Sequence, residues 1–156
     1  MENVYIFAKP TEADAMYVAS NLKHDNQLEI LASIGDNALS DIVQSIKTSD
    51  DIGCLYINGL PAAIYGVKRR SVLSDEGLAW LLMTSEIDNH KVFVAKHCKK
   101  GLKQMLAKYE RVYNWVNVEN EDIIRWLKWM GAKFHGPYKY GVFDKEHYFF
   151  EFERGK

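Results

Sequence analysis

The sequence predicts an α/β fold, in which a mixed, mostly antiparallel sheet of about seven strands carries helices on both faces. Strand and helix signals alternate through the second half of the chain, as they do in mixed sheets covered by helices. The dipeptide Asn58-Gly59 separates two strand-like segments, which is the pattern of a tight hairpin. The segment Leu78–Thr84 is almost wholly apolar, as expected for a strand that is buried on both faces.

The first half of the chain is predicted to supply a strand, three helices and the hairpin. Residues Val4–Ala8 have strand character, and Pro10 ends that strand. Thr11 is a good N-cap for a helix over about Glu12–Leu22. Apolar spacing predicts the other elements of this half, namely helices at Leu28–Ile34 and Leu39–Ile46 and hairpin strands at Cys54–Ile57 and Ala62–Val67.

A long amphipathic helix should follow the apolar strand, from about Asn89 to Tyr109. Its apolar side includes Cys98, which favours a buried thiol over a nucleophile. Its opposite side carries Lys96, Lys99, Lys100 and Lys103. These lysines have two interpretations, a solvated helix face or a contact to phosphates or an acidic partner.

The stretch VNVENEDIIRWLKWMGAKF, residues 116–134, predicts a strand, a helix and a second strand. The first of these strands is expected at Tyr113–Val118. Asn120 is placed as the helix N-cap, and Gly131 as the residue at which the helix ends. The remaining residues, Lys133–Phe152, should form two more strands.

Length and composition bound the class of protein. A chain of 156 residues is expected to fold as one domain over residues 1–156. The net charge of −1 does not favour nucleic acid or an anionic membrane as a partner. No apolar run is long enough for a membrane helix, and no secretory signal is visible, so we expect a cytoplasmic setting. The histidines and two cysteines show no metal-binding spacing, so no metal is expected.

The order of elements, with an asparagine before the last helix and a glycine after it, resembles the GNAT acyltransferase superfamily. At finer grain the chain resembles a GNAT-like family, the small internal virion proteins of short-tailed bacteriophages. The segments that carry this second resemblance are DNQLEILASIG (25–35), NGLPAAIYGV (58–67), NWVNVEN (114–120) and IRWLKWMGAKFH (124–135). The resemblance implies a GNAT-like sheet and acetyl-CoA as a cofactor.

The GNAT resemblance also implies where acetyl-CoA would bind. The pantetheine would lie between two splayed strands, Leu78–Thr84 and Tyr113–Val118, and the pyrophosphate at the start of the long helix. The implied cofactor-binding residues are Leu82, Met83, Thr84, Asn89, His90, Lys91, Asn117 and Asn120. Asn120 keeps a second interpretation, because an N-cap needs no ligand to explain it.

Two features of the GNAT catalytic pattern are missing. The pyrophosphate loop of that family is rich in glycine, whereas the matching segment DNHKVF (88–93) has none and places the carboxylate of Asp88 beside the phosphates. GNAT enzymes often carry a tyrosine seven residues after the asparagine, which protonates the departing thiolate. Here that position is Leu127, which has no proton to donate.

Two further sets of residues are candidates for function. Asp25 and Glu29 lie four residues apart, so one helix face could present both carboxylates to an amine; a solvated helix start is the alternative. Trp126 and Trp129 lie on the flank of their helix. They either widen its buried face or form an aromatic patch for another protein.

Two functions are therefore carried forward from the sequence. The first is a bacteriophage protein associated with the virion or its assembly, located in the host cytoplasm or the virion, with a phage or host protein as partner. The alternative is an acetyl-CoA-dependent N-acetyltransferase that acts on an amine of a protein or small molecule. The missing loop and the missing tyrosine favour the first, because fold alone does not confer activity.

Overall fold

The computed structural model describes residues 2–24, 26–27 and 38–155. Seven strands form one sheet in the order β1-β2-β3-β4-β5-β7-β6. All neighbouring strands are antiparallel except β4 and β5, which run parallel. The strands are β1 (Tyr5–Ala8), β2 (Asp51–Ile57), β3 (Leu60–Arg69), β4 (Glu76–Met83), β5 (Arg111–Asn117), β6 (Lys133–Tyr140) and β7 (Lys145–Glu153). The predicted fold class is thereby confirmed.

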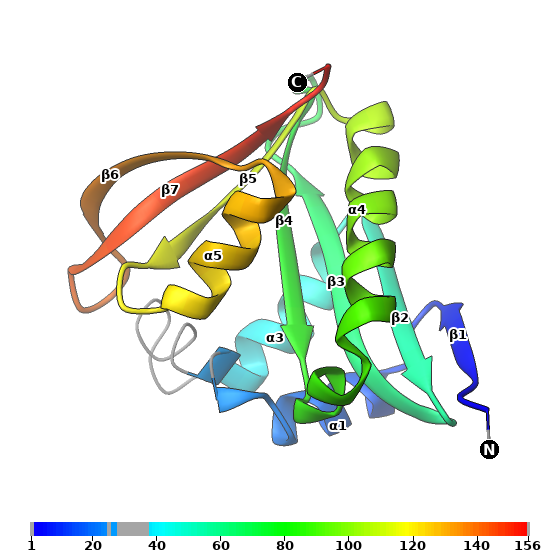
Figure 1. Cartoon of the computed structure of the whole chain (residues 1–156). Helices are drawn as coiled ribbons and strands as arrows, with labels where there is room; N and C mark the ends of the chain where they lie inside the picture. The colour runs from blue at the N-terminus through cyan, green and yellow to red at the C-terminus, as the bar shows by residue number, and fades with distance from the viewer. Residues whose placement is uncertain (1, 25, 28–37, 156) are drawn as a thin grey trace.

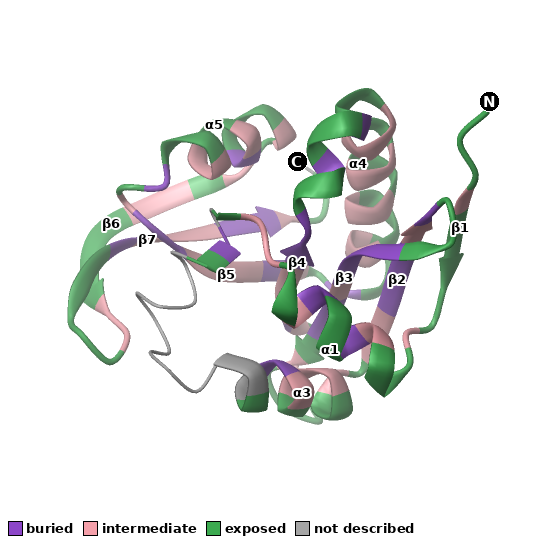
Figure 2. Ribbon diagram, turned by 90° about the horizontal axis from the view of Figure 1, so that it is seen from below, coloured by how far each residue is buried: buried purple, intermediate pink, exposed green. Residues whose placement is uncertain are grey.

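Helices lie on both faces of this sheet, as Figures 1 and 2 show. One face carries α1 (Glu12–Ser20) and α3 (Ala38–Thr48), and the other carries α4 (Lys91–Lys108) and α5 (Glu121–Met130). Adjacent residues of β2 pack on opposite faces of the sheet, because side chains alternate along a strand. Cys54 packs with α1 and α3, whereas Leu55 packs in the cluster that includes Phe93 of α4.

Several predicted element boundaries are confirmed where local chemistry sets them. Thr11 and Asp14 form a capping box at the start of α1. Asn58 and Gly59 both have positive φ, of 51° and 88°, as a two-residue hairpin requires. Gly131 takes the left-handed conformation at the end of α5, with φ of 100°.

Two helix boundaries differ from the prediction because contacts with the sheet override the local pattern. The first helix ends at Ser20 and does not reach Leu22, which instead forms a bridge with Thr84 beyond β4. The long helix begins at Lys91 rather than Asn89, since Ser85–His90 form a separate 3-10 helix, η1. The helix predicted at Leu28–Ile34 lies outside the described residues.

Candidate functional site

The two parallel strands separate soon after they pair. Residue pairs join β4 to β5 only from Glu76–Arg111 to Leu78–Tyr113, although β4 continues to Met83 and β5 to Asn117. Figure 1 shows the two strands diverging beyond these pairs. The sheet therefore contains the splay in which the sequence resemblance places a pantetheine arm, with Leu82 and Met83 on one side and Asn117 on the other.

The β4 side of the splay is hydrogen-bonded by asparagine side chains of the same chain. The buried Asn26 accepts a hydrogen bond from the backbone N–H of Met83 at 2.8 Å and donates a longer one to Leu81 O at 3.5 Å. Asn114 of β5 reaches across the splay and donates to Ala79 O at 2.7 Å. These are the groups through which an extended amide ligand would add itself to β4.

The end of β4 is joined to the segment after α1 as well. The backbone N–H of Lys23 donates to Met83 O at 2.8 Å. On the splay edge of β4, the carbonyls of Ala79 and Leu81 and both backbone groups of Met83 thus have partners in the same chain. A pantetheine amide that paired with these groups would displace these bonds and leave the displaced side chains unsatisfied, at a cost of about 1–3 kcal/mol each.

The turn between β4 and α4 carries carboxylates where a diphosphate would have to bind. Two carboxylates, Glu86 and Asp88, lie in the 3-10 helix that leads directly into α4. Asp88 forms an ion pair with Lys23 at 2.6 Å, so this lysine is engaged by a protein anion. Like charges disfavour bringing phosphate oxygens to this turn.

The three residues implied for the pyrophosphate lie in that turn. Lys91 is exposed at the first position of α4. Asn89 is also exposed, and its amide donates to Glu86 at 3.4 Å. The ring of His90 is buried and contacts Tyr5 Oη at 2.8 Å and Glu86 at 3.1 Å. His90 therefore joins the turn to β1. Together with the paired β4 edge, these contacts do not fit acetyl-CoA.

Asn117, the last residue of β5, and Asn120, just beyond it, are both buried. Asn117 Oδ1 accepts a hydrogen bond from the N–H of Glu119 at 2.9 Å. Asn120 is the N-cap residue of α5, as predicted, although its side chain makes no capping hydrogen bond. The physical reason is its ψ of 69°, far from the extended backbone of a capping residue.

Leu127 is buried in the cluster between α5 and the sheet. This position faces the core, which accounts for an aliphatic side chain where GNAT enzymes often carry a tyrosine. Burial raises the pKa of the Cys98 thiol to about 11, so it stays protonated and is no nucleophile at neutral pH. Among the described residues no group of His, Cys, Asp and Glu could hold a metal ion. The carboxylates of the other catalytic candidates, Asp25 and Glu29, lie outside the described residues.

The two tryptophans of α5 have different surroundings. Trp126 packs against the core cluster between α4, α5 and the sheet. Trp129 is 52% exposed, and Lys99 Nζ lies 4.0 Å from its ring centroid. Lys99 therefore contacts α5, while Lys96, Lys100 and Lys103 are exposed. A partner contact through Trp126 and Trp129 stays a prediction.

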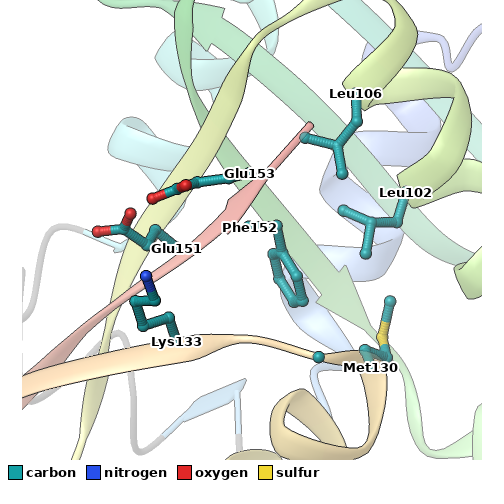
Figure 3. Close-up of a pocket in the computed structure, with 8 residues that line it drawn as sticks. Leu102, Leu106, Met130, Lys133, Glu151, Phe152 and Glu153 are labelled. Carbon is teal, nitrogen blue, oxygen red and sulfur yellow. The ribbon is translucent and has the colours of Figure 1, made fainter. Parts of the chain in front are cut away.

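A small pocket lies between α4, α5, β6 and β7 (Figure 3). Its apolar lining comes from Leu102, Leu106, Met130 and Phe152, and its volume is about 80 Å³. Pockets for drug-sized ligands typically hold about 300–1,000 Å³. Glu153 of its rim is the strand partner of Arg111, so the pocket lies at the end where β4 and β5 are paired. Its volume is too small for a nucleotide cofactor.

The asparagine contacts across the splay were not predicted. Asn26 and Asn114 bond the backbone of residues 55 and 35 positions away. Only the tertiary structure brings such partners together, and neither asparagine lies in a motif that signals it.

Comparison with solved structures gives the class of fold, which is that of the GNAT acetyltransferases. A spermidine N-acetyltransferase SpeG chimera from Vibrio cholerae and hSSAT superposes with a TM-score of 0.71 at 10% identity, covering 96% of this chain and 95% of that chain. An aminoglycoside N(6')acetyltransferase from Legionella pneumophila gives 0.71 at 12% identity, covering 98% and 94%. SpeG from Vibrio cholerae in complex with CoA and spermine gives 0.69 at 10% identity, covering 97% and 96%.

A family model matches part of the sequence. Residues 72–139 match the family model of bacteriophage T7, probable scaffold protein Gp13. This stretch runs from just before β4 into β6 and so includes both arms of the splay. The predicted resemblance to a phage family with a GNAT-like fold is confirmed. No curated protein matches the chain. None of the helices in the described part of the chain is long and apolar enough to cross a membrane.

Proposed function

We propose that this chain is a bacteriophage assembly protein that is associated with the virion or its scaffold and keeps the GNAT fold without using acetyl-CoA. The observation that carries the proposal is the pairing of the β4 edge by Asn26 and Asn114. The carboxylates at the start of α4 support it, and so does the match to a probable phage scaffold protein.

One further feature supports a protein partner, and another argues against catalysis. The exposed Trp129 offers an aromatic anchor of the kind that protein interfaces favour. Acetyl transfer to an amine would instead use a proton-transfer group, and Leu127 supplies none.

The alternative is an acetyl-CoA-dependent N-acetyltransferase, and one observation favours it. β4 and β5 are joined by only three residue pairs and then diverge, and a solved structure of similar fold is described as a complex with CoA and spermine. In that case a ligand must displace the asparagine side chains from β4.

Complementation tests the assembly role. In cells infected by a phage whose copy of this gene carries a stop codon, we expect few infectious particles and incomplete particles by electron microscopy. A plasmid that supplies the wild-type chain should restore both the yield and the composition of the particles. Particles of normal composition and infectivity without this protein would contradict the proposal.

A matched pair of variants addresses the partner contact. Trp129→Ala should reduce rescue, because it removes the exposed ring and leaves the core untouched. Val92→Ala truncates another exposed apolar side chain, 73% accessible, and should rescue normally. Equal rescue by both variants, with the monomer folded, would rule out Trp129 as the contact.

A further inference from the structure

The two outer strands of the sheet are protected very differently. β1 and β6 form its two edges. β6 has a register shift between His135 and Tyr138, Pro137 within it, and lysines at positions 133 and 139. Bulges, proline and lysine are the devices that keep an edge strand from pairing with another chain.

The other edge lacks these devices. The residues from Val4 to Ala8 contain no charge and no proline. Val4, Ile6 and Phe7 are 55%, 52% and 47% exposed, and Figure 2 shows β1 exposed along the margin of the sheet. A bare apolar edge strand is a template for a further strand.

The backbone groups of β1 alternate between β2 and solvent. Val4 O accepts a hydrogen bond from Asn58 N at 2.8 Å, so Val4, Ile6 and Ala8 direct their backbone groups to β2. The N–H and C=O groups of Tyr5 and Phe7 therefore point out of the sheet. They are spaced to form one pair of hydrogen-bonded rings with an antiparallel strand.

The side chains of β1 also alternate. Tyr5 and Phe7 lie on the α4 face, where both stack with Phe93, and Phe7 also stacks with His97. Ile6 lies on the opposite face. Any strand that pairs with β1 must therefore offer aromatic or apolar groups on one face and an aliphatic group on the other.

We infer that β1 pairs antiparallel with β1 of a second copy of this chain, about a two-fold axis at Ile6. In this register Tyr5 faces Phe7 of the other copy, Val4 faces Ala8, and Ile6 faces Ile6. Every pair is apolar and keeps each side chain on its own face. The backbone groups of Tyr5 and Phe7 point outward, so each of these residues exchanges hydrogen bonds with the residue that it faces on the other copy.

β1 of a second copy meets both requirements, since it offers the same outward backbone groups and the same apolar side chains on each face. Both copies use the same surface, so the assembly stops at a dimer. The two seven-stranded sheets then form one continuous sheet of fourteen strands. Pairing of β1 with β6 would grow without end, and the devices on β6 oppose it. The net charge of −1 adds little repulsion between copies. The pairing uses none of the residues on which the proposed function depends.

Sedimentation equilibrium on the wild-type chain and two variants tests the pairing. We expect a dimer for the wild type and a monomer for Ile6→Lys, because two like charges would face each other across the axis. Tyr138→Lys is the matched control: it places the same charge on a residue 53% exposed on the opposite edge, and the dimer should persist. Circular dichroism checks that all three chains are folded.

Mixing variants tests the register. Ile6→Lys and Ile6→Glu should each be monomeric alone and form a one-to-one dimer when mixed, because opposite charges then face each other. Ile6→Cys should form a disulfide-linked dimer on mild oxidation, since residues at a non-hydrogen-bonded position lie about 4.5 Å apart, within disulfide reach. A monomeric wild type, or a dimer that Ile6→Lys leaves intact, would overturn the inference.

Discussion

Asn114 is the residue that most directly joins the two arms of the splay. Its amide donates to Ala79 O at 2.7 Å, and its Oδ1 accepts from the N–H of Trp115. Removing the amide leaves the carbonyl of Ala79 without this partner in a partly buried position. The cost of leaving a buried acceptor unsatisfied exceeds the value of an exposed hydrogen bond.

Asn114→Ala should therefore lower the free energy of unfolding by about 1–2 kcal/mol, measured by urea denaturation. The control is Asn21→Ala, since Asn21 is exposed and donates to Tyr17 O at 2.8 Å. Its effect should stay within about 0.5 kcal/mol. Equal effects of the two substitutions would show that the Asn114 bond does not tie the splay together.

Asp51 couples stability to pH at the other end of the sheet. Burial alone would raise its pKa, but hydrogen bonds from Lys108 and Tyr109 outweigh this and hold the pKa of Asp51 below its usual value of 3.8. A carboxyl whose pKa is lowered by folding contributes stability above its unfolded pKa. That contribution is lost as pH falls through the folded pKa.

Asp51→Asn should thus make the chain less stable at pH 7 and flatten the loss of stability as pH falls below the usual carboxyl pKa of 3.8. Urea denaturation of the wild type and the variant across this range measures the difference. Parallel pH profiles for the two proteins would contradict the lowered pKa.

At the scale of elements, the end of α5 depends on one backbone conformation. Gly131 has φ of 100°, and a Cβ built there would meet no atom within 4 Å. Gly131→Ala should therefore destabilise the protein by about 1 kcal/mol through backbone strain alone. Gly101→Ala, also in open space but inside α4, should instead stabilise it by about 0.5–1 kcal/mol. Thermal unfolding distinguishes the two, and a neutral Gly131→Ala would contradict the strain.

The elements that the sequence predicts well are those set by their own residues. The Thr11 capping box, the Asn58-Gly59 turn and the glycine after α5 each act over a few positions. The boundaries at Leu22 and Lys91 were wrong because pairing with the end of β4 and the 3-10 helix set them. The splay was implied by resemblance, whereas its pairing by Asn26 depends on contacts between distant segments.

At the scale of the whole molecule, the chain has the fold of the GNAT acetyltransferases, and several backbone groups on the splay edge of β4 are bonded within the chain. A fold of this kind can serve a different role once its site has changed. The sheet positions two other surfaces, the exposed ring of Trp129 and the bare β1 edge. Both are suited to contacts with proteins, as an assembly role requires.

Calorimetric titration with acetyl-CoA, with CoA and AMP as controls, tests the central claim that the β4 edge is unavailable to a cofactor. We predict no saturable heat with any of the three, and no rise in melting temperature, because a ligand that does not bind the native state cannot stabilise it. Saturable micromolar binding of both acetyl-CoA and CoA, with none of AMP, would contradict the claim that the β4 edge is unavailable. The N-acetyltransferase would then be the better-supported function.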